Sequence, residues 1–327
     1  MRIERFDPEA DAGATRSCHE IYLAGLPLDD PNGPPMGYRI FTGWISRGWT
    51  EDPQEAWLAR DGAGAAAGFY VIGLPARENR HLAYLRVFVD PARRREGIGT
   101  ALLGRAAERA RQAGRAGLSG DARDGGAGVA FGLARGARLG LAEIRRVREA
   151  GPVPGSVRAA AAIAPAAGYE LVPWTGPIPE EHLAAIAAIN GALADAPLGQ
   201  GHEPQVWDAD RLRQAEKRDQ EQGTREYAVA ARSRVTGELA GLTQLGVDPE
   251  TPEWGYQQLT AVMRAHRGHR LGLWMKIAML DWLAEREPGL RRIITGNGDG
   301  NQHMIAINDA LGFRVLDRWP SIELEVR

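Results

Sequence analysis

The chain has 327 residues, a formal net charge of −2 and an isoelectric point near 6.4. Its length exceeds what one typical domain needs, so we expect two domains of roughly 150 residues, each able to bury a core. The near-neutral charge provides no overall field for a polyanion, which argues against nucleic acid as a partner.

The sequence also argues against disulfides, metal sites and membrane insertion. Cys18 is the only cysteine, and nothing has the spacing of a zinc site, so no metal is expected. The opening residues, MRIERFDPEADAG, lack the apolar core of a signal peptide, and no apolar run approaches the roughly 20 residues of a spanning helix. These features predict a cytoplasmic protein without a membrane partner.

The first half alternates strands and helices. Apolar periodicity and breaker residues predict a strand at 2–6, helices at 11–24 and 36–47, strands at 55–60, 67–73 and 81–89, a helix after residue 97, a short strand near 118, a helix near 129 and a strand at 141–149. In the helix after residue 97, Ile98, Leu102, Ala106 and Ala110 fall on one face. We expect that face to be buried.

Around Ala150 the composition changes to GPVPGSVRAAAAIAPAAG. A glycine-, proline- and alanine-rich stretch is typical of a linker, here with room for a short helix between Val157 and Ile163. We therefore expect an N-terminal domain at 1–150, a linker at 151–167 and a C-terminal domain at 168–327.

The second half repeats the order of the first. The pattern predicts a strand at 169–174, helices at 178–194 and 208–222, strands at 226–232, 238–247 and 254–263, a helix at 270–286, a strand at 291–295, a helix at 301–311 and a strand at 314–326. An offset of 173 positions carries Val89 onto Val262, Arg94 onto Arg267, Ile98 onto Leu271 and Gly99 onto Gly272. Gly136 and Gly312, at the later helix-to-strand junctions, differ by 176 positions. Two copies of one α+β unit explain this spacing.

The stretch RRREGIG, residues 93–99, joins a predicted strand to a predicted helix. A helix start exposes backbone N–H groups, and the macrodipole adds positive charge there. Gly97 and Gly99 leave room for a diphosphate beside the main chain, while Arg94 and Arg95 offer charge-assisted hydrogen bonds. The sequence thus predicts a diphosphate cradle. The alternative is a solvated basic helix start whose glycines serve only the turn.

At this stretch the chain resembles the GNAT superfamily of acetyl-CoA-dependent N-acetyltransferases. The family signature is Arg or Gln, two residues, Gly, one residue, then Gly or Ala, and Arg94, Gly97 and Gly99 match it. In the second half Arg267 and Gly272 match, but Arg270 stands where the middle glycine is expected. The resemblance covers almost the whole chain as two tandem units, a layout similar to that of mycothiol synthase and of uncharacterised bacterial tandem acetyltransferases.

The resemblance implies a fold and a cosubstrate. Each unit is expected to hold a central, mixed, mostly antiparallel sheet flanked by helices, with a V-shaped splay between the fourth and fifth strands where acetyl-CoA lies. Its pantetheine would pair with the main chain of the fourth strand, and one N–H of that strand would polarise the thioester carbonyl. The implied contact residues are Val87, Phe88, Val89, Arg94, Arg95, Glu96, Gly97, Ile98, Gly99 and Thr100 in the first half, and Val262, Arg267, Gly268, His269, Arg270, Leu271 and Gly272 in the second.

The family's usual proton donor is missing from both halves. A tyrosine often neutralises the leaving thiolate, yet Asn308 and Gly132 occupy the positions four residues before Gly312 and Gly136. Tyr84 is the candidate acid or substrate contact in the first half, although its ring could equally pack while its hydroxyl meets water. Glu253 and Tyr256 are the second-half counterparts.

Two other motifs are assigned to structure. GNGDGN, residues 296–301, lacks the spacing of a dinucleotide fingerprint and predicts a turn with Asn301 as a helix N-cap. His266 and His269 lie three positions apart without a further ligand, which favours the phosphate loop or the surface over a metal site.

These features predict an enzyme that acetylates a primary amine of a small molecule by direct transfer from acetyl-CoA. We expect a monomer, as a pseudo-dimer of its two units, or a homodimer. The missing tyrosines leave open a non-catalytic acyl-CoA-binding protein, and a protein N-acetyltransferase is a further alternative.

Overall fold

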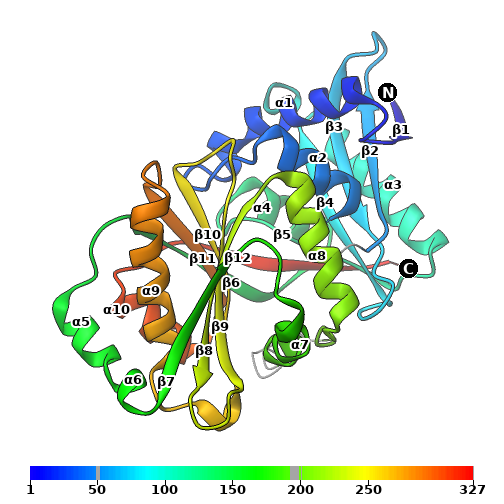
Figure 1. Cartoon of the computed structure of the whole chain (residues 1–327). Coiled ribbons are helices and arrows are strands. Elements are labelled where there is room, and N and C mark those ends of the chain that lie inside the picture. Colours follow the sequence, from blue (N-terminus) through cyan, green and yellow to red (C-terminus); the bar gives the residue numbers. More distant parts are fainter. Residues whose placement is uncertain (49–51, 192–198, 200, 327) are drawn as a thin grey trace. The chain divides into compact units, whose positions relative to one another are not determined.

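The computed structural model describes residues 1–48, 52–191, 199 and 201–326. The chain forms two compact units: unit 1 contains Met1–Glu143, Gly199–Glu203 and Asp317–Arg327, and unit 2 contains Ile144–Leu198 and Pro204–Leu316. Each unit is a sheet with helices against it (Figure 1), which confirms the predicted fold class.

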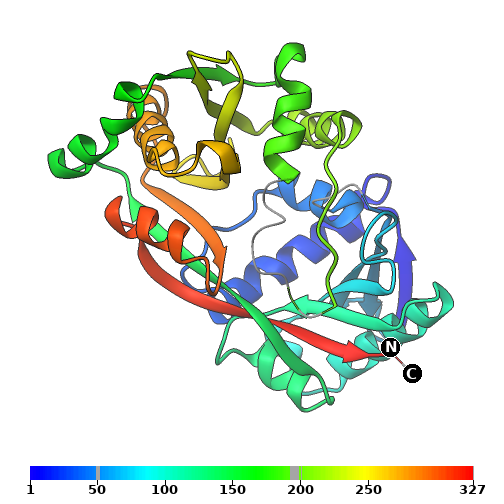
Figure 2. The ribbon, with the colours of Figure 1, turned by 90° about the horizontal axis from the view of Figure 1, so that it is seen from below.

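The sheet of unit 1 is mixed and mostly antiparallel. It contains β1 (Arg2–Phe6), β2 (Gln54–Arg60), β3 (Ala66–Gly73), β4 (Leu82–Val89), β5 (Gly117–Asp121) and most of β12 (Arg314–Glu325), hydrogen-bonded in the order β1-β2-β3-β4-β5-β12. β4 and β5 are parallel. The last strand, β12, drawn in red in Figure 2, pairs antiparallel with β5 from Ser321 opposite Asp121 to Glu325 opposite Gly117.

Helices cover both faces of this sheet. Helix α1 (Ala12–Asp29) begins where the Asp11 side chain accepts a hydrogen bond from the Ala14 N–H, at 2.9 Å. With α2 (Tyr38–Arg47) it buries an aromatic core that includes Phe41 and Phe69. Helix α3 (Ile98–Gln112) covers the opposite face. As predicted, it buries Ile98, Leu102, Ala106 and Ala110.

Unit 2 repeats this arrangement. Its sheet contains β7 (Tyr169–Thr175), β8 (Arg225–Ser233), β9 (Leu239–Val247), β10 (Trp254–Val262), β11 (Arg292–Gly298) and the end of β6 (Arg138–Glu149), in the order β6-β11-β10-β9-β8-β7. Helices α7 (Leu183–Gly191) and α8 (Ala209–Gln222) cover one face. Helices α9 (Leu271–Arg286) and α10 (Gln302–Ala310) lie on the other (Figure 1). The predicted helix at 178–194 extends past α7 into positions outside the described residues.

The segment expected to be a linker is part of the core of unit 2. It forms two short helices, α5 (Gly155–Ala161) and α6 (Ile163–Ala166), rather than one. Ala161 and Ala164 are buried against α9 and its surroundings. The alanines that make the segment look like low-complexity sequence are small enough to let these helices pack closely.

The expected domains at 1–150 and 168–327 stay a prediction, and the compact units divide the chain differently. The break between units falls after Glu143, inside β6, and Asp317–Glu325 of β12 belongs to unit 1. The last strand in the sequence therefore completes the sheet of the first unit.

Candidate functional site

The RRREGIG stretch of unit 1 forms a tight loop between β4 and α3. A short 3-10 turn, Pro91–Arg93, follows the strand. Arg95 and Gly97 then adopt left-handed backbone conformations, with φ of 73° and 84°. Helix α3 begins at Ile98, and no side chain of the described residues caps its start. Its first N–H groups are thus available to an anion.

Unit 2 has the same loop conformation, but its left-handed glycine stands at the second position of the signature and not at the fourth. The 3-10 turn Arg264–His266 follows β10, and φ is 89° at Gly268 and 57° at Arg270. In each six-residue signature, residues 94–99 and 267–272 (the two hexamers), the second and fourth residues are therefore left-handed. These are Arg95 and Gly97 in unit 1, and Gly268 and Arg270 in unit 2. Arg270 in the middle-glycine position does not change the backbone path, although a left-handed arginine is less favourable than glycine.

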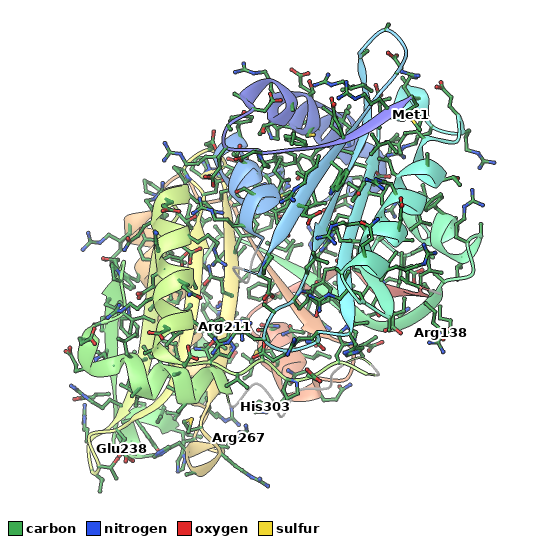
Figure 3. The ribbon with its side chains drawn as sticks, turned by 90° about the vertical axis from the view of Figure 1, so that its right-hand side faces the viewer. Met1, Arg138, Arg211, Glu238, Arg267 and His303 are labelled. Carbon is green, nitrogen blue, oxygen red and sulfur yellow. The ribbon has the colours of Figure 1, made fainter. Side chains whose placement is uncertain are left out.

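The loop arginines divide into structural and available ones. Arg94 is held by Asp29, 2.5 Å from its carboxylate, and donates from Nε to the Val89 carbonyl at 3.5 Å. Arg267 makes the corresponding contact, from Nε to the Val262 carbonyl at 3.2 Å, from its place on the loop after β10 (Figure 3). The signature arginine thus ties each loop back to its strand.

Arg95 is an available cation in the loop between β4 and α3. It is exposed, and no residue in the described part of the chain forms an ion pair or hydrogen bond with it. Arg270 of unit 2 is likewise exposed and has no such partner among the described residues. The sequence predicted this role for both Arg94 and Arg95, but the Arg94 guanidinium already has a carboxylate partner.

The other residues predicted to contact acetyl-CoA are either bonded to neighbouring side chains or packed against them. Glu96 pairs with Arg93 at 2.9 Å, and the Thr100 hydroxyl accepts from Arg135 at 2.6 Å. Ile98 and Leu271 are buried helix residues. Methyl groups added to Gly99 and Gly272 would meet Phe131 at 3.5 Å and Ile307 at 3.3 Å. His269 bonds within its own loop, to the His266 carbonyl at 3.2 Å.

In unit 1 the parallel strands β4 and β5 separate toward this loop. Their pairing stops at Tyr84 opposite Ser119, although β4 continues to Val89 beside β3. The His81 carbonyl points toward β5, and the Asp90 N–H points toward β3. The main-chain N–H and C=O groups of successive residues in a strand point alternately to its two neighbours. Those of Val87 therefore point toward the side of β4 from which β5 has separated.

The predicted strand residues therefore divide in two. The main-chain N–H and C=O groups of Val87 and Val89 point to the side of β4 from which β5 has separated, and pantetheine pairing is predicted on that side. Phe88 instead stacks on Phe69, with ring centroids 4.6 Å apart. An ion pair between Arg86 and Asp121 joins the two strands just beyond their last paired residues.

In unit 2 the same strands separate with one added feature. The pairing of β10 with β11 stops at Gln257 opposite Thr295. The ladder between β10 and β9 shifts register between Gln257 and Thr260, which is a β-bulge, and a bulge leaves main-chain groups outside the ladder. No such shift interrupts the ladder of β4 with β3.

Tyr84 lies at the last paired position of β4 and is 39% exposed. Burial of its ring raises the pKa of its hydroxyl, and the nearby carboxylates Asp52 and Glu78 raise it further. The group therefore keeps its proton at neutral pH. In unit 2, Glu253 is exposed before β10, and Tyr256 is half-buried within it.

The two positions of the missing tyrosine differ. Asn308 is fully buried on α10, and a methyl group added at Gly132 of α4 (Ala127–Leu133) would lie 2.7 Å from Ile322. Unit 1 therefore has no space for a side chain at this position, whereas unit 2 holds a buried amide there.

Sequence reasoning missed two ionisable groups of unit 2. Lys276 on α9 is 2% exposed, and burial lowers its pKa to about 7. Glu226 on β8 accepts a hydrogen bond from Gln258 at 3.1 Å, and burial, assisted by Asp219, raises its pKa to about 8. A lysine within the apolar run LWMKIAML was the one available signal for the first.

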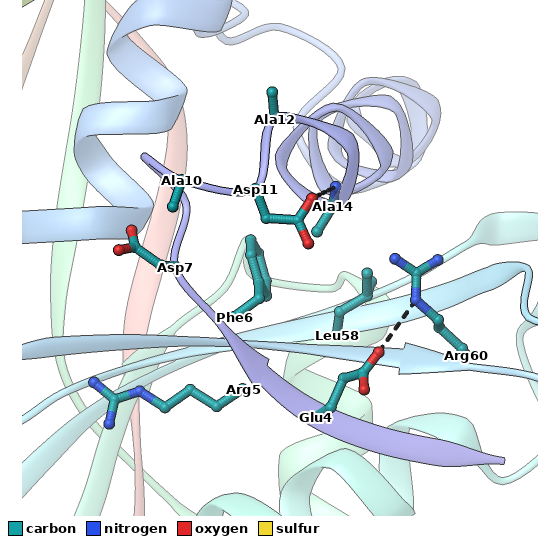
Figure 4. A pocket seen from close by; sticks show the side chains of 10 residues that line it. All are labelled: Glu4, Arg5, Phe6, Asp7, Ala10, Asp11, Ala12, Ala14, Leu58 and Arg60. Atoms are coloured by element: carbon teal, nitrogen blue, oxygen red, sulfur yellow. Dashed lines mark hydrogen bonds and ion pairs between the residues drawn. The ribbon is translucent and has the colours of Figure 1, made fainter.

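A surface pocket of unit 1 contains none of these residues. Its lining comes from β1, β2 and the start of α1: Glu4, Arg5, Phe6, Asp7, Ala10, Asp11, Ala12, Ala14, Leu58 and Arg60 (Figure 4). Glu4 pairs with Arg60 at 3.4 Å, and Asp11 caps α1. Its charged groups are thus satisfied within the fold.

A family model described as acetyltransferase (GNAT) family matches residues 16–119 and 195–313, more than half of the chain. The chain belongs to the GNAT acetyltransferase family. GNAT enzymes transfer acetyl groups from acetyl-CoA, and this chain is an acetyl-CoA-dependent N-acetyltransferase with two GNAT units. The predictions of family, enzyme class and cosubstrate are confirmed.

Solved structures agree with this tandem GNAT fold. A tandem GNAT protein from the clavulanic acid biosynthesis pathway, solved without acetyl-CoA, is 27% identical with a TM-score of 0.80, over 100% of this chain and 98% of that one. A GCN5-related N-acetyltransferase from Sphaerobacter thermophilus is 15% identical with a TM-score of 0.69, over 100% and 96% of the two chains, and supports the fold alone. A search of curated proteins finds no match.

The part of the chain that the structure describes contains no helix long and apolar enough to cross a membrane.

Proposed function

We propose that this GNAT enzyme transfers the acetyl group of acetyl-CoA directly to a primary amine of a small molecule, with the diphosphate held by the loop at residues 94–99. The observation that carries the proposal is the loop itself. It combines left-handed Arg95 and Gly97, an uncapped helix start and a free guanidinium at the end of a strand whose partner has separated from it. This arrangement suits a diphosphate followed by an extended chain.

Direct transfer is favoured over a covalent acetyl-enzyme. Cys18, the only cysteine in the sequence, is fully buried, and that burial raises the pKa of its thiol. A buried, protonated thiol is a poor nucleophile. The lone unpaired thiol also fits the proposed cytoplasmic location.

A small acceptor is favoured by the similarity to a tandem GNAT protein from a pathway that makes a small molecule. The competing acceptor is the amino group of a protein. Mass spectrometry of products from a panel of small amines and a panel of peptides distinguishes them, and initial rates test direct transfer, which requires intersecting rather than parallel double-reciprocal lines.

The loop is tested with paired substitutions that both tolerate a left-handed backbone. Gly97→Asp places a carboxylate in the cradle, whereas Gly97→Asn is nearly the same size and neutral. We expect Gly97→Asp to weaken acetyl-CoA binding at unit 1 by tenfold or more in calorimetry, and Gly97→Asn to change it by about threefold at most.

Arg270→Asp and Arg270→Asn form the matching pair in unit 2. Each pair of substitutions changes only its own loop. The number of acetyl-CoA molecules bound per chain therefore reports which unit binds acetyl-CoA. If Gly97→Asp and Gly97→Asn bind acetyl-CoA equally well, the unit 1 loop does not hold the diphosphate and the proposal is wrong. A non-catalytic acyl-CoA-binding protein would bind normally yet release no coenzyme A with any amine.

A further inference from the structure

Lys276 is a buried amine without a counter-ion. Its Nζ donates to Asn308 Oδ1 at 2.6 Å and lies 5.0 Å from the centre of the Phe313 ring. Among the residues that the structure describes, no carboxylate lies within ion-pair distance of it. A buried ammonium held only by an amide and a ring is costly. This cost lowers the pKa of Lys276, so Lys276 acts on its neighbours through its hydrogen bond and not through a fixed charge.

The lysine fixes the orientation of two amides. Lys276 Nζ donates to Asn308, so Asn308 turns its oxygen to Lys276 and its Nδ2 to Asn297 Oδ1, at 2.8 Å. Asn297 must then direct its own Nδ2 away from Asn308. In the described part of the chain nothing accepts a hydrogen bond from that Nδ2. The three side chains form a relay of donors that ends in a free N–H.

The free donor lies where the strands part. Asn297 is two residues beyond Thr295, the last residue of β11 that pairs with β10. It is half-buried, while Asn308 and Lys276 behind it are buried. The relay thus runs from the core under α9 to the separating end of β11.

Unit 1 has no equivalent. The repeat offset of 173 places Leu103 at the Lys276 position, and the offset of 176 places Gly132 at the Asn308 position. A side chain at Gly132 would collide with Ile322. The relay is therefore a property of unit 2 and not of the shared fold.

We infer that Lys276, through Asn308, positions the Asn297 amide to donate a hydrogen bond to the coenzyme A sulfur in unit 2, and that this N–H group stabilises the negative charge on the sulfur. The inference rests on the proposed acetyl transfer and extends it to the second unit. As the amine nitrogen bonds to the acetyl carbon, the carbon–sulfur bond breaks and its electron pair stays on sulfur. The proton lost by the amine converts the thiolate to the thiol, and Lys276 ends unchanged.

Lys276 and Asn308 are positioning residues, so the test measures the pKa of the bound coenzyme A thiol. Coenzyme A is titrated into the full-length Gly97→Asp protein, which leaves unit 2 as the binding site, and thiolate absorbance in the ultraviolet is followed against pH. Desulfo-coenzyme A, which lacks the thiol, gives the baseline. We expect the bound thiol to titrate at least one pKa unit lower in this protein than after Lys276→Met, a tenfold difference in thiolate fraction at a given pH.

Two further variants keep the test decisive. Asn297→Ala removes the terminal donor and the acceptor of Asn308 Nδ2 but leaves Lys276 and its bond to Asn308 in place. It therefore replaces Lys276→Met if that protein does not fold, and it should also raise the pKa of the bound thiol. Leu103→Met in unit 1 is the matched control and should change nothing. In turnover by the Gly97→Asp protein, where unit 2 is the site that remains, Asn297→Ala should lower kcat at least tenfold while leaving the KM for acetyl-CoA within about twofold.

The outcomes separate this inference from the proposed function. Coenzyme A bound at unit 2 with the same thiol titration in all variants overturns the relay. So does the absence of any binding once Gly97→Asp has blocked unit 1. Neither result bears on acetyl transfer in unit 1. That proposal fails if Gly97→Asp and Gly97→Asn bind acetyl-CoA equally well, or if no amine is acetylated.

Discussion

At the scale of single residues, Lys276 makes stability depend on pH. Its pKa falls from 10.5 to about 7 in the folded protein. Between these values the unfolded chain binds more protons, so stability rises with pH in that window, and the full cost of burial is present below pH 7. Lys276→Met removes this dependence.

We therefore expect Lys276→Met to have a higher free energy of unfolding than the natural protein at about pH 7, and this gain should be smallest near pH 10. The difference between these pH values should be a few kcal/mol at most, at about 1.4 kcal/mol per pKa unit. Urea unfolding at a series of pH values measures it. The lost bond to Asn308 adds a constant, so a difference that does not vary with pH would contradict the buried, neutralised lysine.

Tyr84 is a residue-scale prediction for catalysis. Its raised pKa keeps the hydroxyl protonated at neutral pH, so it could donate a proton to the leaving thiolate but not accept one from the amine. If it is the acid of unit 1, Tyr84→Phe lowers kcat by about 10²-fold when unit 2 is blocked by Arg270→Asp, and it leaves the melting temperature nearly unchanged. An unchanged kcat would mean that only the ring matters.

Among the elements, β6 has its most buried polar side-chain anchor in unit 2 at Arg148. Arg148 is 5% exposed and donates to four carbonyl oxygens: those of Leu311 at 2.8 Å, Glu149 at 3.0 Å, Gly151 at 2.6 Å and Pro152 at 3.3 Å. The planar guanidinium joins the strand to the residues after α10 and to the start of the next segment. A lysine cannot reach all four.

We expect Arg148→Lys to lower the free energy of unfolding by about 2–4 kcal/mol, because buried carbonyls lose their donors. Arg158→Lys is the matched control, since Arg158 pairs with Asp281 at the surface and should change stability by less than about 1 kcal/mol. Denaturant unfolding compares the two. Equal effects would show that the Arg148 bonds do not anchor β6.

Most elements could be predicted from the sequence because apolar periodicity marks them locally. The buried face of α3 and the Asn301 cap of α10, which accepts from the Met304 N–H at 3.2 Å, both follow from residues close in the sequence. Loop conformation was harder. A glycine marked one left-handed position in each hexamer, but Arg95 and Arg270 occupy the others, and nothing local marks an arginine as left-handed.

The site was predictable only in part, for the same reason. Residue type predicted the diphosphate cradle, which stays a prediction, but whether the guanidinium of Arg94 or of Arg95 is free depends on Asp29, which is 65 positions earlier in the chain. The relay of Lys276, Asn308 and Asn297 joins three elements. Such long-range pairs are not encoded in local pattern.

At the scale of the whole molecule, the sequence did not predict which sheet each closing strand joins. Residues 141–149 and 314–326 both read as closing strands of their own halves. In the structure β12 pairs with β5, and β6 neighbours β11. Strand partners are set by tertiary packing, so two similar strands can be exchanged without any change in their own pattern.

Removing residues 317–327 should therefore damage unit 1 rather than unit 2. The deletion exposes the edge of β5 and removes Leu324 and Val326, which pack against the hydrophobic cluster between α3 and the sheet. We expect faster amide exchange in β5, weaker acetyl-CoA binding at unit 1 and little change in β8 and β9. Exchange measured by mass spectrometry reports each strand, with Glu325→Ala as the control. Protected β5 amides after the deletion would refute the assignment of β12 to unit 1.

The position of β12 sets an order of events during translation. Asp317 follows Asp121 by 196 positions, so a ribosome releases β5 long before its partner exists. The N-terminal half must wait with an open strand edge, which invites chaperone binding or misassembly with a neighbouring nascent chain. The half that is made first is completed last.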